Sequence, residues 1–356
     1  MYGYGNSFFL TTRAILAESN AAVLPVNTVA PVLSGTAQEN QTLTCSTGTW
    51  TGTPTITYSY QWKRNGSNIG SATNSTYTLV TADVGQSILC TVTATNGAGS
   101  VNADSNTVTP TSAVDPDAQA FITAASITNP TQQSAINTLV VNLKGYNIWS
   151  KMKALYPFVG GTATTHKFNL KNPLDTDAAF RLVFNGGWTH SSLGALPNGT
   201  NAWANTFLNL NTMNSINDIS FGYYSRTNSI SNGSFGWVSS SPPVELYIRY
   251  TGNVKYGYLF DAANDGGAAT DCRGLNSISR TASNQKYIQI NNTINSYSSA
   301  SSGSLSSRNF QFALGSQTYE DRQNAFGFIG NGLTNTELAN LYTAVQAFQT
   351  TLGRQV

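Results

Sequence analysis

Acidic side chains are the groups in this sequence best suited to hydrolytic chemistry, and their spacing limits what they can do. Cleavage of a glycosidic bond needs two carboxyl groups about 5–10 Å apart, one acting as an acid and the other as a nucleophile or base. Glu245 stands alone in its segment, and Glu320 and Asp321 are adjacent. Adjacent residues of a strand point to opposite faces of the sheet. We therefore predict no catalytic residues and a protein that is not an enzyme.

Oxygen ligands for a metal ion are clustered in one Gly-rich run, residues 261–267, which contains Asp261 and Asp265 and is followed by Asp271. Calcium prefers such ligands in flexible loops. The run lacks the spacing of a defined calcium motif, so a solvated turn is the alternative, and we expect no cofactor other than such a Ca²⁺ ion. His166 and His190 fit no metal-ligand or catalytic spacing and are expected to be hydrogen-bonded loop residues.

Carbohydrate recognition uses aromatic rings with amide and hydroxyl groups nearby, and several loop-rich stretches supply both. Trp203 is the first candidate, because polar residues flank it on both sides in the run from Gly199 to Asn205. The other candidates lie in or beside similar stretches: Trp188, Tyr224, Trp237 and Arg226. The alternative is that these aromatic side chains belong to hydrophobic cores.

Composition separates this chain from several classes of protein. Charged residues make up 10% of the 356 residues, aromatic residues 11%, and the formal net charge is +2. Many aromatics with little charge predict a folded chain. We expect no nucleic-acid partner, because no run of basic residues is present, and no membrane span, because no apolar stretch is long enough. The N-terminus lacks the regions of a signal peptide, so we expect synthesis in a cytoplasm.

Cys45, Trp62 and Cys90 have the order and spacing of an immunoglobulin-like sandwich, which we place at residues 27–110. The residue two positions before the second cysteine is Ile88, so the usual tyrosine corner is missing. The cysteines should face each other across the sandwich. Because cytosol keeps thiols reduced, we expect their bond to form only after release from the cell. Cys272 is expected to be a free, inert thiol.

Local signals predict helices at both ends of the remaining segment, residues 111–356. Asp115–Pro116 and Asn129–Pro130 combine an N-cap with proline at the first helical position. Thr334 and Glu337 form a capping box before a final amphipathic helix. Between them, short strands separated by turn residues predict a large antiparallel sandwich, with strands at 179–184, 218–224, 245–250, 286–290 and 310–314.

Four runs within this segment resemble a domain of bacteriophage virion proteins that has the concanavalin A-like, laminin G-like lectin fold. They are residues 143–161, 164–170, 184–191 and 328–333. The expected fold class is therefore all-β: an immunoglobulin-like sandwich followed by a larger concanavalin A-like jelly roll, with short helices at its start and C-terminus. Glycosidases of this fold usually carry Glu-x-Asp-x-x-Glu on one strand, and no such run occurs here.

The resemblance implies a structural component of a phage virion: a fibre, decoration or tail protein that displays a lectin-like domain for adhesion to host-surface glycans. Residues 1–26 would dock the chain to other virion proteins, and the alternative for this segment is a frayed chain end. A homo-oligomer is expected, with a trimer as one candidate, although no heptad or repeat fixes the number. Two alternatives stay open, namely a glycan-cleaving enzyme of the same fold and a purely structural subunit that contacts only its neighbours.

Overall fold

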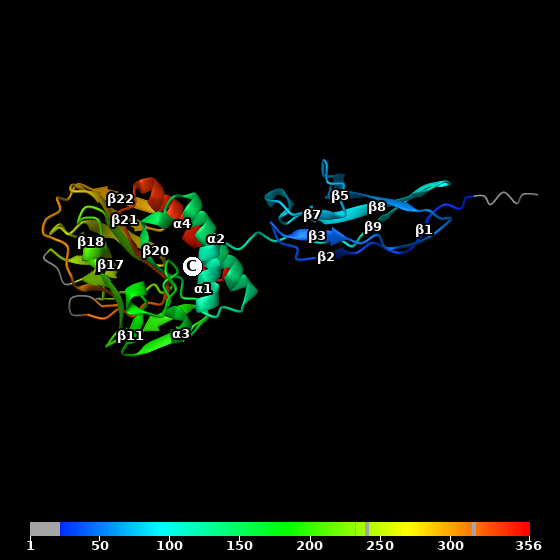
Figure 1. Cartoon of the computed structure of the whole chain (residues 1–356). Helices are drawn as coiled ribbons and strands as arrows, with labels where there is room; N and C mark the ends of the chain where they lie inside the picture. Colours follow the sequence, from blue (N-terminus) through cyan, green and yellow to red (C-terminus); the bar gives the residue numbers. More distant parts are fainter. Residues whose placement is uncertain (1–21, 232, 239–241, 315–317) are drawn as a thin grey trace, which may run out of the picture. The chain divides into compact units, whose positions relative to one another are not determined.

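The computed structural model describes residues 22–231, 233–238, 242–314 and 318–356, and the chain divides into two compact units between Ala113 and Val114 (Figure 1). Each unit is described by itself. Most of the expected docking segment, residues 1–21, lies outside the described residues. Within them, no helix combines the length and apolar character needed to cross a membrane.

The smaller unit is a sandwich of short antiparallel strands. One sheet has the order β2-β3-β7 and the facing sheet the order β6-β5-β8-β9, with β1 and β4 paired beside them. The strands are β1 (Val26–Val29), β2 (Leu33–Ser34), β3 (Thr42–Cys45), β4 (Thr49–Thr51), β5 (Thr57–Arg64), β6 (Ser67–Asn68), β7 (Thr76–Thr78), β8 (Ile88–Asn96) and β9 (Gly99–Asp104). This is the immunoglobulin-like arrangement expected from the sequence.

The core of the smaller unit is built around Trp62, which is fully buried and donates a hydrogen bond from Nε1 to the carbonyl of Asn74 at 2.9 Å. Cys45 comes from β3 and Cys90 from β8, so the two thiols lie on facing sheets and pack in the same cluster. Both are free and buried. Hydrogen bonding with the Cys45 thiol, together with burial, raises the pKa of Cys90. Ile88, at the position of the missing tyrosine corner, is fully buried in this core.

We predict that oxidation joins Cys45 to Cys90 and stabilises the smaller unit. The two residues are 45 positions apart, and closing a loop of that length stabilises a fold by about 4 kcal/mol in the chain-entropy model. Thermal unfolding with and without a reductant measures the effect. The Cys45→Ala variant should unfold at one temperature under both conditions. An equal reductant effect in this variant would contradict the pairing.

The larger unit contains two antiparallel sheets and a layer of helices. The first, here called the helix-side sheet, has the order β12-β13-β24-β15-β20-β21-β22, and β10 also pairs with β24. Its strands are β10 (Met152–Tyr156), β12 (Trp188–Ser191), β13 (Gly194–Pro197), β15 (Ile219–Ser225), β20 (Gly274–Ala282), β21 (Gln285–Ile290), β22 (Thr293–Tyr297) and β24 (Asn324–Gly330).

The second sheet has the order β11-β14-β23-β16-β17-β18-β19. Its strands are β11 (Val183–Asn185), β14 (Trp203–Asn209), β16 (Phe235–Val238), β17 (Val244–Tyr250), β18 (Val254–Leu259), β19 (Gly266–Ala268) and β23 (Asn309–Phe312). A hydrophobic cluster that includes Phe221, Ile278, Leu246 and Phe310 fills the space between the two sheets. The prediction of an all-β sandwich fold is therefore confirmed.

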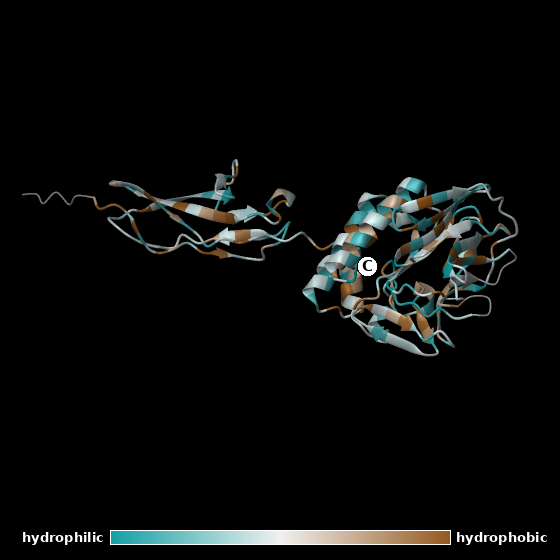
Figure 2. Ribbon diagram, turned by 180° about the vertical axis from the view of Figure 1, so that it is seen from behind, coloured by the Kyte–Doolittle hydropathy of each residue, from teal (hydrophilic) through white to brown (hydrophobic). Residues whose placement is uncertain are grey.

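The helices are α1 (Pro116–Ala124), α2 (Pro130–Gly145), α3 (Ala163–His166) and α4 (Asn335–Thr351). α1, α2 and α4 cover the outer face of the helix-side sheet, where Leu139 and Phe348 pack in one cluster with Phe328 of β24 (Figure 1). The predicted caps Asp115, Asn129 and Thr334 all accept backbone hydrogen bonds. Figure 2 shows polar and apolar stretches mixed along these helices, as expected for helices with one buried face.

One expected strand is placed differently. Residues 179–184 do not form a continuous strand, because Asp177–Ala179 make a 3₁₀ turn and Phe180 has a left-handed backbone with φ +60°. The carbonyl of Phe180 accepts a hydrogen bond from the Tyr156 hydroxyl at 2.6 Å. Strand β11 therefore begins only at Val183. The apolar residues that suggested a strand belong instead to a turn, which is held to the core by the hydrogen bond from Tyr156.

His166, which is buried, and His190, which is half-buried, form a hydrogen-bonded pair rather than two separate loop residues. His166 ends α3 and is 1% exposed, and His190 lies in β12. The Gly161 N–H donates to His166 Nε2 at 3.2 Å, so neutral His166 carries its proton on Nδ1 and donates it to His190 Nδ1 at 2.9 Å. Burial lowers the pKa of His166 to about 3, and His190 and Arg354 add to this effect. Burial also lowers the pKa of His190.

This pair makes the larger unit sensitive to acid. A base whose pKa is lower in the folded state binds more protons when unfolded, so stability falls as the pH drops from 6.5 towards 3. His166 alone should cost about 2 kcal/mol between pH 7 and pH 5. Urea unfolding at the two pH values measures this loss, which should be smaller in His166→Gln. Equal losses in both proteins would show that the pair does not control the acid sensitivity.

Candidate functional site

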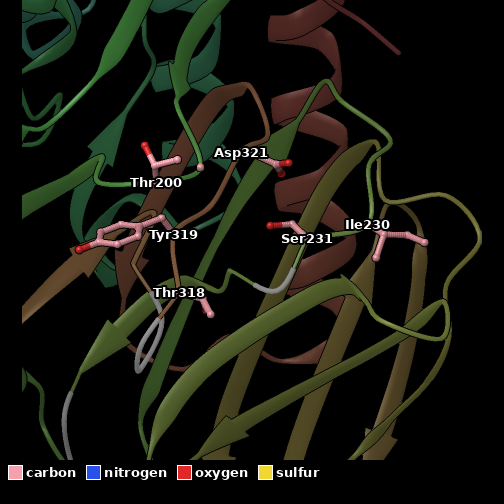
Figure 3. Close-up of a pocket in the computed structure, with 7 residues that line it drawn as sticks. Thr200, Ile230, Ser231, Thr318, Tyr319 and Asp321 are labelled. Atoms are coloured by element: carbon pink, nitrogen blue, oxygen red, sulfur yellow. The ribbon is translucent and has the colours of Figure 1, made fainter.

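A surface pocket of the larger unit combines three segments that are far apart in the sequence (Figure 3). Its volume is about 480 Å³. The lining comes from the turn between β13 and β14, the segment after β15, and the segment before β24: Gly199, Thr200, Ile230, Ser231, Thr318, Tyr319 and Asp321. Figure 3 shows Thr200 and Tyr319 on one side of the opening, with Ser231 and Ile230 on the other.

Local hydrogen bonds fix the turn that carries Thr200. The Asn198 carboxamide oxygen accepts from the backbone N–H groups of Thr200, Asn201 and Ala202, at 3.1 to 3.2 Å. Gly199 has φ +72°, and a Cβ there would lie 3.1 Å from the Cβ of Asp321, so a side chain at this position would be strained and crowded. The turn can therefore approach the Asp321 segment closely.

The opposite wall is held by backbone contacts. The Ser231 N–H donates to the carbonyl of Arg249 in β17 at 3.1 Å. At Gly233, a Cβ would lie only 2.5 Å from the Glu320 nitrogen, so glycine allows this segment to lie directly against the backbone before β24. The Asp321 carboxylate accepts from the Ser229 hydroxyl at 3.3 Å. These contacts hold the described segments of this wall against each other.

A buried ion pair lies beneath the pocket. Arg322 Nη1 donates to both carboxylate oxygens of Glu320, at 2.6 and 2.8 Å, and both side chains have no exposed surface. Arg322 also donates to the carbonyls of Ser229 and Arg249. Burial raises the pKa of Glu320 to about 7, against the opposing charge of Arg322. The Arg322 guanidinium thus links the segments that contain Ser229, Arg249 and Glu320.

The chemistry of the lining is that of a polar binding site. Hydroxyl groups come from Thr200, Ser231, Thr318 and Tyr319, and Asp321 is the one carboxylate among the described lining residues. Tyr319 also supplies an aromatic ring. A few polar groups around an aromatic surface fix the orientation of a small ligand.

The candidate residues named from the sequence are not part of this pocket. Trp203 is half-buried in β14, and Trp188 donates from Nε1 to the carbonyls of Asn185 and Trp203 while its ring packs at the edge of the core. Arg226 donates to the carbonyl of Arg354 and to Gln323. Trp237 lies in β16, opposite Gln311, and its side chain lies outside the described part of the structure.

Tyr224 requires a correction. It has no exposed surface, lies in the cluster between the helix-side sheet and the helices, and donates to Gln346 Oε1 at 3.3 Å. The ring therefore has no face open to a ligand. The expectation of a solvent-facing ring failed because both faces of β15 are buried, which the loop-rich sequence after it does not reveal.

Asp261 and Asp265 also lie in surroundings other than those expected. Asp261 is buried and pairs with Arg280 and with Lys286 Nζ at 2.9 Å, while Asp265 Oδ2 lies 3.0 Å from the same Nζ. Asp261 is therefore not part of a solvated turn, and two cations already occupy its oxygens. Within the described ranges, no group of three or more His, Cys, Asp or Glu side chains is arranged to hold a metal ion.

Cys272 and Glu245 are buried as well. The Cys272 thiol lies 3.4 Å from the carbonyl of Thr227, and burial raises its pKa. Glu245 is 4% exposed and accepts from the Tyr247 hydroxyl at 3.1 Å. Neither group lines the pocket.

A cluster of four tyrosines on the second sheet was missed in the sequence. Tyr247 of β17 lies opposite Tyr256 of β18, with ring centroids 4.6 Å apart and nearly parallel planes. Tyr250 and Tyr258 contact Tyr256 edge-on. Their spacing was the available signal, because Tyr256 and Tyr258 are two residues apart on a strand and share one face. We call this cluster the tyrosine face.

Comparisons with known proteins add no functional information to this geometry. No family model and no curated protein matches the sequence. Among solved structures, domain 4 of AbnA, a GH43 extracellular arabinanase from Geobacillus stearothermophilus in complex with arabinotriose, matches 54% of this chain and 98% of its own, at 12% identity and a TM-score of 0.32. A likeness this low carries no functional argument.

We predict that breaking the buried ion pair loosens the pocket. Arg322→Met leaves the Glu320 carboxylate buried without its cation and should destabilise the larger unit by about 3–5 kcal/mol. Glu320→Gln leaves the Arg322 guanidinium buried without its anion. It should still cost less, because the Gln amide oxygen can accept from Arg322 and the guanidinium keeps its bonds to the carbonyls of Ser229 and Arg249. Urea unfolding of the two variants measures the difference. Equal losses would mean that the pair does not brace these segments.

Proposed function

We propose that this chain is a non-enzymatic adhesion protein whose larger unit binds a glycan in the pocket lined by Tyr319 and Asp321. The observation that carries the proposal is the pocket itself: four hydroxyl-bearing residues, one carboxylate and one aromatic ring surround about 480 Å³ on well-braced segments. Sites for small ligands commonly measure roughly 300–1,000 Å³. A neutral sugar ring offers hydroxyl donors to Asp321 and an apolar face to Tyr319.

The arrangement of carboxylates supports binding over cleavage. Two-carboxylate hydrolysis needs both acids on either side of the bond, whereas only Asp321 lines the pocket among the described residues. Its neighbour Glu320 is buried in the ion pair with Arg322 and accepts two hydrogen bonds from it. The pocket therefore has a residue to hold a hydroxyl group and lacks a described partner acid.

The proposal extends to the setting of the protein. The resemblance of residues 143–161 and 184–191 to phage virion proteins supports a fibre, decoration or tail component that displays this unit towards a bacterial surface. A single open pocket binds weakly, and many copies on one particle convert weak contacts into firm attachment. Residues 1–26 remain the proposed connection to the particle, and the oligomeric state is set by that assembly.

Binding to bacterial surface polysaccharides tests the proposal. Asp321→Ala and Tyr319→Ala should each weaken binding about tenfold, because each removes a direct ligand contact worth 1–2 kcal/mol. Tyr58→Ala, which removes an exposed tyrosine of the smaller unit, is the matched control and should bind as the wild type does. Isothermal titration or a glycan array provides the measurement.

Other outcomes would support the alternatives. Release of shorter sugars from the polysaccharide, lost in Asp321→Ala, would identify a glycan-cleaving enzyme. Absence of binding to every glycan tested would favour a structural subunit that contacts only its neighbours. Binding that is equal in Asp321→Ala, Tyr319→Ala and wild type would place the glycan elsewhere, and the tyrosine face would then be examined with Tyr256→Ala.

A further inference from the structure

A second pocket, of about 320 Å³, contains a buried lysine with no partner. Lys255 of β18 lines it together with Thr270, Thr293 and Ile290. The Lys255 residue is only 7% exposed, and it makes no hydrogen bond or ion pair within the described part of the chain. Burial lowers the pKa of its amine, because nothing nearby compensates the positive charge.

The other buried cations of the described residues all have partners. Lys286 donates to Asp261 and to the carbonyl of Gly257, both at 2.9 Å. Arg280 pairs with Asp261, and Arg322 with Glu320. Arg354 donates to carbonyls and to the side chain of Gln349. Lys255 departs from this pattern: it lines a pocket and has no described partner, whereas Arg354, which also lines a pocket, donates to several oxygens.

The strand register explains why Lys255 is buried. It alternates with Tyr256 and Tyr258, which belong to the tyrosine face, so its side chain points to the opposite side of β18. β19 pairs closely beside it: a Cβ at Gly266 would lie 1.8 Å from the Lys255 carbonyl oxygen, so only glycine permits this approach. Lys255 is thus on the inner side of β18, where it lines the pocket.

The acid nearest in the lining does not neutralise Lys255. Asp271 also lines the pocket, but it accepts from Arg273 Nη2 at 2.7 Å and from Arg273 Nε at 3.1 Å. The remaining lining groups that matter are the hydroxyls of Thr270 and Thr293 and the apolar side chain of Ile290. The pocket thus offers one unpaired cation, two hydroxyl groups and an apolar wall.

We propose that this pocket binds the carboxylate of an acidic sugar residue, with Lys255 as its cation. The proposal rests on the proposed glycan-binding function and extends it to anionic glycans. A carboxylate supplies the negative charge that would pair with the Lys255 amine, and a sugar ring supplies hydroxyl groups for Thr270 and Thr293. Charge-assisted hydrogen bonds of this kind are stronger than neutral ones. The alternative is that the aliphatic part of the Lys255 side chain is buried and its ammonium group is simply hydrated.

The test uses the full chain and three probes at equal ionic strength: glucuronate, glucose and acetate. Glucuronate should bind saturably by isothermal titration, glucose about tenfold more weakly or worse, and acetate more weakly than glucuronate because it lacks the ring. Lys255→Met keeps the buried stem without the charge and should lose glucuronate binding by about tenfold. Lys153→Met, a half-buried lysine outside the pocket, is the matched control and should bind normally.

Each outcome decides the matter. Lys255→Arg keeps a positive charge and should retain glucuronate binding within a few-fold. Comparing it with Lys255→Met separates loss of the charge from the effect of changing this residue on folding. Equal glucuronate binding in Lys255→Met and wild type, or none in the folded wild type, would overturn the proposal and leave a solvated lysine. Asp321→Ala should bind glucuronate normally. If the protein binds glucuronate but no neutral glycan, only the proposal for the Asp321 pocket is rejected. If it binds a neutral glycan but not glucuronate, only the proposal for the Lys255 pocket is rejected.

Discussion

Central strands of the helix-side sheet are covered on both faces, by α1, α2 and α4 on one side and by the second sheet on the other. Every residue of β15 and of β24 is buried as a result. Polar side chains on this sheet must therefore find partners inside the protein. Ser220 donates to the carbonyl of Asn331 at 2.7 Å, and Ser279 donates to that of Leu333 at 2.8 Å. These bonds hold the segment before α4 against the sheet, so the polar residues fix the helix layer.

The same constraint decides where a ligand can be bound. Because the helices take one face of the first sheet, the surface left for recognition is the outer side of the second sheet and the loops at strand ends. Both pockets are found at such loops, and the tyrosine face lies on β17 and β18. β17 links these features, since the carbonyl of Arg249 accepts from Ser231 and from Arg322 on the pocket side. A change in β17 would therefore be transmitted to the first pocket.

The sequence predicted the features that depend on neighbouring residues, namely helix starts and several strands. The caps Asp115, Asn129 and Thr334 begin helices in the structure, and the strands near 219–225, 244–250, 285–290 and 309–312 were expected. β20 was missed, because its alternating serines and its Arg280 do not read as a buried strand. The pocket was missed for a different reason: Thr200, Ser231 and Asp321 meet only through tertiary contacts. Tyr224 was misplaced since no local pattern reveals that helices cover β15.

Because the chain carries few charges, single charged side chains in the pockets determine how a ligand is recognised. With a net charge of +2 and few ionisable groups, the chain produces little long-range field, so ligand encounter is not steered by electrostatics. Recognition must then come from individual groups at short range. Asp321 supplies a single carboxylate to one pocket and Lys255 a single amine to the other, each on a background of hydroxyl groups. Binding through Asp321 to neutral hydroxyls should depend little on salt, whereas an anion held by Lys255 should be released as ionic strength rises, because screening weakens a partly exposed ion pair. The two pockets are thus separable by salt alone, without any change to the protein.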